Sequence, residues 1–205
     1  MPASIPRIAA ALIALVCWTG IALQFSATYG HSGGVLLMLW TLARFFTIIS
    51  NLAIAATMTI VALGGRISPF LLGGLSLAIL LVGIVYLLLL RGLHPLSGAA
   101  LLADYLLHYV SPVAMVAYWL ACTPHGQLRW SAPLWWTAFP LTYFLYAIVR
   151  GEIDGRYPYP FMDVTKLGLA RALLNGLVIG AAFIPTGLAV VWADRRLLGR
   201  GRSSR

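Results

Sequence analysis

The sequence predicts an all-α integral membrane protein, a bundle of six transmembrane helices with one structured outer loop. Of its 205 residues, 61% are hydrophobic and only 9% are charged, whereas a soluble domain carries about 25% charged residues. The apolar residues gather in six runs, each close to the roughly 20 residues with which a helix crosses about 30 Å of hydrocarbon. A chain of this length has room for one such bundle, so we expect a single domain over residues 1–205.

Each apolar run is bounded by turn-forming residues, and the connections between most runs are short. We expect helices at residues 8–29, 35–63, 68–90, 99–122, 134–149 and 167–192. The first run follows Arg7 and resembles a signal peptide, but its apolar core exceeds the usual length of about 7 to 15 residues and no A-x-A cleavage site follows it. We therefore expect a retained helix. Glycine-containing breaks at 30–34, 64–66, 91–95 and 123–126 make consecutive helices antiparallel neighbours.

The one long connection covers residues 150–163. It holds three of the five acidic residues and an alternating run of tyrosine and proline from Tyr157 to Pro160. One interpretation is an interfacial belt of aromatic residues with prolines as helix breakers. The other is a structured lid over the outer mouth of the bundle, and its apolar rings lead us to expect that it folds against the helix ends.

Charge predicts the orientation and the partners of the bundle. The net charge is +9, and five of the fourteen basic residues lie in the last eleven positions. We expect residues 193–205 to form a basic cytoplasmic tail that contacts anionic lipid headgroups, and we expect no nucleic acid partner. Six crossings place both termini in the cytoplasm, in a bacterial cytoplasmic membrane. Cys17 and Cys122 lack paired spacing, so we expect no disulfide, metal site or cofactor.

A polar stripe runs through the second apolar segment. At about 100° per residue, Arg44, Thr47 and Asn51 fall on one face of a helix, and Trp40 and Ala55 extend that face. An arginine inside a membrane-length segment costs about 2.5 to 3.5 kcal/mol on insertion scales. This stripe is therefore the first candidate for a functional site.

The fourth segment supplies a matching polar face. Asp104 and His108 lie one turn apart, and they are the only carboxylate and the only histidine well inside the six segments. Counting residues from the start of each segment predicts an ion pair between Arg44 and Asp104 and a contact between Thr47 and His108. Pro112 cannot donate to the carbonyl of His108, so we expect a kink there.

Three interpretations of this cluster remain open on the residues alone. In the first, the cluster is a packing salt bridge with satisfied polar neighbours in a non-catalytic scaffold. In the second, Asp104, His108 and Arg44 form a proton or solute pathway. In the third, His108 is the general base for attack by the Thr47 hydroxyl on a carbonyl, and Arg44 or Asn51 stabilises the oxyanion.

Three runs carry a resemblance to a known family: FFTIISN from Phe45, LHYVSP from Leu107 and YPYPFMD from Tyr157. In a chain with six predicted helices, this order and spacing resembles the androgen-induced membrane hydrolases, and more closely their bacterial relatives. Eukaryotic members hydrolyse fatty acid esters of hydroxy fatty acids with an intramembrane threonine and histidine. The resemblance implies that Thr47 is the nucleophile and His108 the base.

The predicted function is therefore a threonine-type intramembrane hydrolase of lipid esters. The catalytic residues are Thr47 and His108, and the remaining polar residues of the cluster are expected to bind substrate: Arg44, Ser50, Asn51 and Asp104. The alternative is a membrane lipid, solute or proton pathway protein without hydrolase activity.

Overall fold

A computed structural model describes residues 4–93 and 95–200, and that part of the chain is helical and contains no strand. Five of its helices are long and apolar enough to cross a membrane, and a sixth span is added if one bent pair of helices is counted together. The predicted all-α membrane fold is confirmed. The helices form two compact units, Met1–Thr123 and Pro124–Arg205, and each is described by itself.

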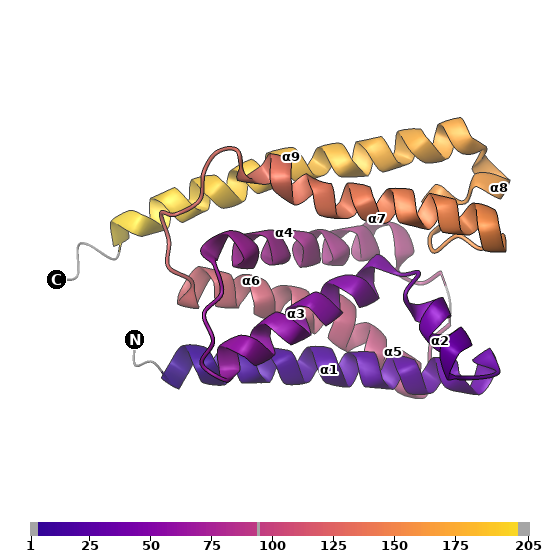
Figure 1. Ribbon diagram of the computed structural model, residues 1–205, viewed down its shortest axis with the longest axis horizontal. Coiled ribbons are helices and arrows are strands. Elements are labelled where there is room, and N and C mark those ends of the chain that lie inside the picture. The colour runs from indigo at the N-terminus through magenta and orange to yellow at the C-terminus, as the bar shows by residue number, and fades with distance from the viewer. Residues whose placement is uncertain (1–3, 94, 201–205) are drawn as a thin grey trace. The chain divides into compact units, whose positions relative to one another are not determined.

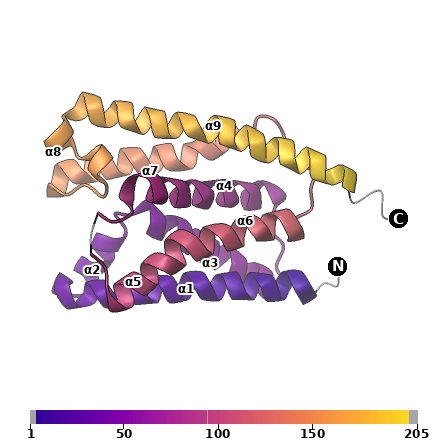
Figure 2. The same ribbon diagram turned by 180° about the vertical axis from the view of Figure 1, so that it is seen from behind.

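The first unit contains the whole candidate site. Its helices are α1 (Ser4–Ser32), α2 (Val35–Leu42), α3 (Phe46–Ala62), α4 (Pro69–Val85), α5 (Gly98–Tyr105) and α6 (Ser111–Cys122). Two π-helical turns extend them: η1 (Tyr86–Leu90) continues α4, and η2 (Leu106–Val110) joins α5 to α6. Both views show α3 lying along α1 and α4 lying beside α6 (Figures 1 and 2).

The predicted straight helix over 35–63 is wrong. The segment consists of α2 and α3, which meet at an angle of 97° around residues 43–45. Phe45 is extended, with φ −94° and ψ 127°, and it precedes the first turn of α3. Residues 43–45 contain neither glycine nor proline, so the sequence carries no helix-breaking signal. Because of the bend, Trp40 and Arg44 do not continue the face of Thr47.

Together, α2 and α3 nevertheless extend along the whole length of α1. Trp18 in α1 donates from Nε1 to the Thr59 hydroxyl near the end of α3, at 3.2 Å. Gly64, just past α3, lies against the guanidinium of Arg7, since a Cβ added there would be 2.7 Å from Nη2. The chain has therefore returned to the end of α1 at which it began. This favours counting α2 and α3 as one span, which gives the six crossings that we predicted.

The expected kink at Pro112 takes the form of the π-helical turn η2. Proline has no amide hydrogen for the His108 carbonyl, and its ring crowds that carbonyl. The backbone widens instead, and the amide of Ser111 donates to the carbonyl of Leu106, five residues back. Such turns occur frequently at functional sites. Gly83 on α4 fits against the widened turn, because a Cβ there would lie 3.3 Å from Pro112 Cβ.

The second unit is a pair of long helices with a folded connection. It contains α7 (Ala132–Asp154), a 3₁₀ turn η3 (Pro160–Met162), α8 (Val164–Leu167) and α9 (Leu169–Arg200). In both views α7 and α9 lie side by side (Figures 1 and 2). The approach is close, since a Cβ added to Gly176 of α9 would overlap the ring of Phe144.

Helix α7 extends five residues beyond the predicted end at 149. The charged residues past that point stabilise the helix instead of ending it. Arg150 donates to the Tyr146 hydroxyl at 2.6 Å and lies 3.6 Å from the Asp154 carboxylate, one turn on. The helix ends at Gly155, whose φ of +67° is the left-handed conformation that glycine adopts most easily.

The long connection is structured, as predicted. Met162 is 1% exposed, and Asn175 of α9 donates to the carbonyl of Phe161 at 2.8 Å. The Tyr157 hydroxyl donates to Glu152 at 2.5 Å. Burial, together with this bond to a carboxylate, raises the pKa of Tyr157 to about 12. The loop is therefore fastened to α7 at one end and to α9 at the other.

The predicted helix end at 192 is wrong, because α9 continues to Arg200; residues 201–205 of the predicted basic tail lie outside the described part. Asp194 is fully buried in this helical extension. Its carboxylate lies 3.2 Å from His125 Nδ1 and accepts from the amide of Leu128 at 3.0 Å. A buried carboxylate with two partners fastens the loop before α7 to the end of α9.

We predict that residues on the two sides of the bent pair are exposed on opposite faces of the membrane. In a chain with Cys17 and Cys122 replaced by alanine, the single variants Val35→Cys and Arg66→Cys should react with a membrane-impermeant maleimide from opposite sides of oriented vesicles. If α2 and α3 were a re-entrant loop, both cysteines would react from the same side.

Candidate active site

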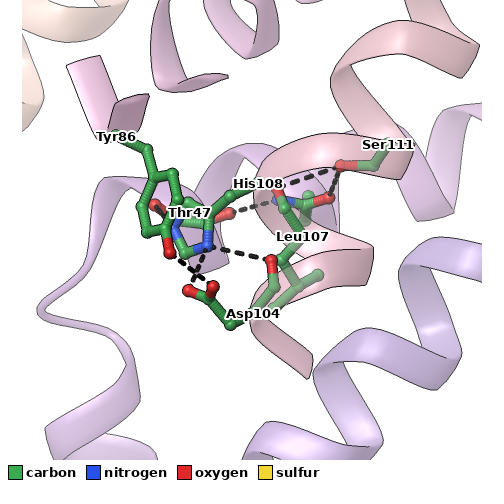
Figure 3. Close-up of polar contacts among 7 residues, drawn as sticks. Thr47, Tyr86, Asp104, Leu107, His108 and Ser111 are labelled. Atoms are coloured by element: carbon green, nitrogen blue, oxygen red, sulfur yellow. Dashed lines mark hydrogen bonds and ion pairs between the residues drawn. The ribbon is translucent and has the colours of Figure 1, made fainter. Parts of the chain in front are cut away.

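Thr47 lies at the start of α3, directly after the bend. It is the second residue of the helix, and only 6% of it is exposed. Its hydroxyl oxygen lies 3.2 Å from Nε2 of His108, which projects from η2 (Figure 3). The predicted contact between these two side chains is confirmed. This separation is within the range expected for a nucleophile and its general base.

The other ring nitrogen of His108 lies beside two oxygen atoms of Asp104. Nδ1 lies 3.0 Å from Oδ1 of Asp104 and 3.2 Å from the backbone carbonyl of the same residue. Both oxygens accept hydrogen bonds, so Nδ1 carries the proton of the neutral ring. The Nε2 lone pair then faces Thr47. The i, i+4 spacing noted in the sequence thus favours this tautomer of His108.

Asp104 does not have the partner that we predicted. Its Oδ1 contacts His108, and its Oδ2 accepts from the Tyr86 hydroxyl at 2.5 Å, so its described contacts do not include Arg44. The prediction assumed a straight helix over 35–63 in which Arg44 and Thr47 share a face. The 97° bend falls between them. Arg44 is buried at the bend, with 7% of its surface exposed.

Asn51 fastens the two helices that carry the site. Its amide nitrogen donates to the carbonyl of Thr47 at 2.9 Å and to that of Leu107 at 3.3 Å. Its side-chain oxygen accepts from the Ser111 hydroxyl at 2.6 Å. Both donors are used on backbone carbonyls, so Asn51 positions α3 against η2 and does not have the free donor that an oxyanion contact requires.

Ser50 and Arg44 are the two remaining predicted substrate contacts. Ser50 is fully buried, and its hydroxyl has no hydrogen-bond partner in the part of the chain that the structure describes. Arg44 lies three residues before Thr47 along the chain, on the other side of the bend. Contact of either residue with a substrate stays a prediction.

Sequence reasoning missed Tyr86, which contacts two residues of the cluster. Its ring stacks on the His108 ring with centroids 4.1 Å apart and an interplanar angle of 19°. Its hydroxyl bonds to Asp104, as Figure 3 shows. A single tyrosine in an apolar run also fits an ordinary packing position, so the sequence offered no signal that singled it out.

The site lies about halfway along the helices of the first unit. Gly20 of α1 faces the side chain of Leu107, because a Cβ at Gly20 would lie 2.6 Å from Leu107 Cδ2. Gly20 is close to the middle of α1, which is itself long and apolar enough to cross a membrane. His108 is the next residue after Leu107. The side chains of the Thr47–His108 contact therefore lie near the middle of a span and not at its end.

Comparison with known proteins adds no assignment: the chain matches no protein-family model, and neither the curated proteins nor the solved structures give a significant match. The family resemblance stays a prediction. The geometry of Thr47, His108 and Asp104 consequently carries the functional argument.

We predict that Asn51→Ala lowers stability by about 1 to 3 kcal/mol, the usual cost of leaving buried polar groups without partners. Thermal unfolding in detergent measures the loss. Ser50→Ala is a matched control, since Ser50 is equally buried and its hydroxyl has no partner among the described residues. Combined with Ser111→Ala, the Asn51 loss should be less than additive. Equal losses in the Asn51 and Ser50 variants would contradict the role of Asn51.

Proposed function

We propose that this protein is an intramembrane hydrolase of lipid esters that uses Thr47 as a covalent nucleophile. The observation that carries the proposal is the position of His108, with one ring nitrogen 3.2 Å from the Thr47 hydroxyl and the other 3.0 Å from the Asp104 carboxylate. A nucleophile, a base and an acidic group that orients the base form the constellation used for acyl transfer on unrelated folds.

In the first half of the reaction, the Thr47 oxygen attacks the ester carbonyl as His108 Nε2 accepts its proton. The tetrahedral intermediate collapses when the protonated His108 gives that proton to the departing alcohol oxygen. The C–O bond of the ester breaks, and the acyl group remains on Thr47. Asp104 stays ionised throughout and stabilises the transient imidazolium through Nδ1–H.

In the second half, a water molecule attacks the acyl group on Thr47. His108 Nε2 accepts a proton from that water and then returns it to the threonine oxygen, which releases a carboxylic acid and restores the site. The complete reaction consumes one ester and one water and produces one alcohol and one acid.

The amide of Thr47 is suited to stabilise the oxyanion. The first-turn amides of a helix have no partner within the helix, and α3 begins at Phe46 without a side-chain cap. The positive end of the helix dipole favours negative charge at the same place. In an apolar surrounding, such a donor acts more strongly than it does in water. Arg44, close to Thr47 in the chain, is proposed as a further contact to the substrate.

The proposed substrates are fatty acid esters of hydroxy fatty acids or similar acyl esters. The depth of the site supports this class, because an ester must reach the middle of a span to meet Thr47. The sequence resemblance to the androgen-induced membrane hydrolases points to the same class. We also propose that both termini face the bacterial cytoplasm, where Arg195 and Arg196, each over an exposed tryptophan ring at 5.2 and 5.3 Å, meet anionic headgroups.

A proton pathway is the second candidate, and one observation favours it. Tyr86, Asp104, His108 and Thr47 form a continuous chain of polar contacts inside an apolar unit. Chains of this kind occur as proton relays in pumps and transporters. A pathway depends on Asp104 and His108 and tolerates loss of the Thr47 hydroxyl, whereas the hydrolase depends on all three.

We predict that Thr47→Ala and His108→Ala abolish hydrolysis of a fatty acyl ester of a hydroxy fatty acid and abolish labelling by a fluorophosphonate probe. Thr47→Ser should retain turnover, because it keeps the hydroxyl. Purified protein in detergent or nanodiscs is assayed for released acid, and the labelled peptide should contain Thr47. A folded Thr47→Ala variant with wild-type activity would exclude the covalent mechanism.

We predict separately that Asp104→Asn lowers kcat by about 10³- to 10⁴-fold, as loss of the orienting carboxylate does in serine hydrolases. An amide at this position can donate to Nδ1, which moves the ring proton to Nε2 and removes the acceptor for Thr47. Asp163→Asn is the matched control, because Asp163 lies in the loop of the second unit and bonds to Thr165. Equal activity of the two variants would exclude an orienting role for Asp104.

A further inference from the structure

Tyr86 contacts both members of the His108–Asp104 pair from one side. It is the first residue of η1 and is only 9% exposed. Its hydroxyl lies 2.5 Å from Asp104 Oδ2, and its ring stacks on the imidazole of His108 at 4.1 Å. The close-up shows that the phenol lies alongside the imidazole while its oxygen reaches the carboxylate (Figure 3).

The hydroxyl holds the carboxylate at the oxygen that His108 does not use. A carboxylate bonded through Oδ1 alone can rotate about its terminal torsion, which is broad for aspartate. A second bond at Oδ2 fixes that rotation and keeps Oδ1 directed at His108 Nδ1. A hydrogen bond from a hydroxyl to an ionised acceptor is short and about twice as strong as a neutral one. It also compensates a charge that lies away from bulk water.

The ring restrains the base itself. The two rings are within 19° of parallel, so the phenol limits rotation of the imidazole about its own axis. Nδ1 is held by Asp104, and the stacked ring keeps Nε2 directed at Thr47. Tyr109 packs edge-on to the Tyr86 ring at 5.4 Å, which holds the phenol in turn.

The backbone near Tyr86 is shaped for this approach. Gly83, three residues earlier on α4, faces the His108 carbonyl, and an added Cβ would lie 3.4 Å from it. The lack of a side chain at Gly83 lets α4 come close to η2. Tyr86 in η1 and His108 in η2 lie face to face across this close approach.

We propose that Tyr86 is a positioning residue for the hydrolase: it fixes the Asp104 carboxylate through its hydroxyl and the His108 ring by stacking, and it makes no contact with the ester. This inference rests on the proposed function. It assigns separate tasks to the hydroxyl and the ring, so removal of the hydroxyl alone and removal of the whole ring should have graded effects.

The test uses the full-length protein and two measurements. Tyr86→Phe should lower kcat by about 10- to 100-fold, by analogy with the loss of groups that orient metal ligands, and Tyr86→Leu should lower it further. KM should stay within about twofold, because the substrate does not touch Tyr86. Tyr105→Phe is the matched control, since Tyr105 is 51% exposed and next to Asp104 in the chain.

The second measurement separates positioning from folding. At saturating fluorophosphonate, the first-order rate constant of labelling reports the active molecules alone, and the amplitude reports how many are folded. Tyr86→Phe should lower the rate constant and leave the amplitude unchanged. A lower amplitude with a wild-type rate constant would overturn the inference, because Tyr86 would then serve packing only.

Failure of the inference and failure of the proposed function give different results. One result is that the wild-type protein hydrolyses the ester, Thr47→Ala does not, and Tyr86→Phe has the wild-type kcat. This result would overturn the role of Tyr86 and still support the proposed hydrolase. A wild-type protein that neither cleaves the ester nor reacts with the probe would overturn both.

Discussion

The contact of one imidazole with two side chains organises the first unit. His108 lies between the Thr47 hydroxyl and the Asp104 carboxylate, and in the proposed mechanism it acts as a base only while its proton stays on Nδ1. Three groups around it serve this arrangement. Asp104 selects the tautomer, Tyr86 restrains the ring and the carboxylate, and Asn51 bonds α3 to η2. Under the proposed function, loss of any of these groups would leave His108 present but misdirected.

Two irregular stretches of backbone bring these groups together. The bend before α3 turns the start of that helix, with Thr47, toward the middle of the unit. The π-helical turn at Pro112 widens the backbone where His108 projects. Irregular backbone inside a membrane protein is tolerated where its polar groups are satisfied, and here the Asn51 side chain donates to the carbonyl of Leu107 within the turn. Hydrogen bonding at the site therefore offsets the free-energy cost of the irregular backbone.

Much of this architecture was predictable, and the reasons for the exceptions are physical. Apolar length and turn residues are enough to predict the helical membrane fold, because a span must be long and apolar. The Thr47–His108 contact followed from counting residues along two segments. The bend at residues 43–45 could not be predicted, since no glycine or proline marks it. The predicted pairing of Arg44 with Asp104 was wrong for that reason. Tyr86 could not be found, because stacking between distant segments leaves no periodic signal in a single sequence.

If acyl groups pass through the Thr47 oxygen, product partitioning with methanol should reveal the shared acyl-enzyme. Esters that share one acyl group and differ in the alcohol are hydrolysed in the presence of methanol, and the ratio of methyl ester to free acid is measured. A common acyl-threonine intermediate predicts one ratio for all alcohols, since the alcohol has departed before water or methanol attacks. A ratio that changes with the alcohol, or that is unaltered in Thr47→Ala, would exclude an acyl-threonine intermediate.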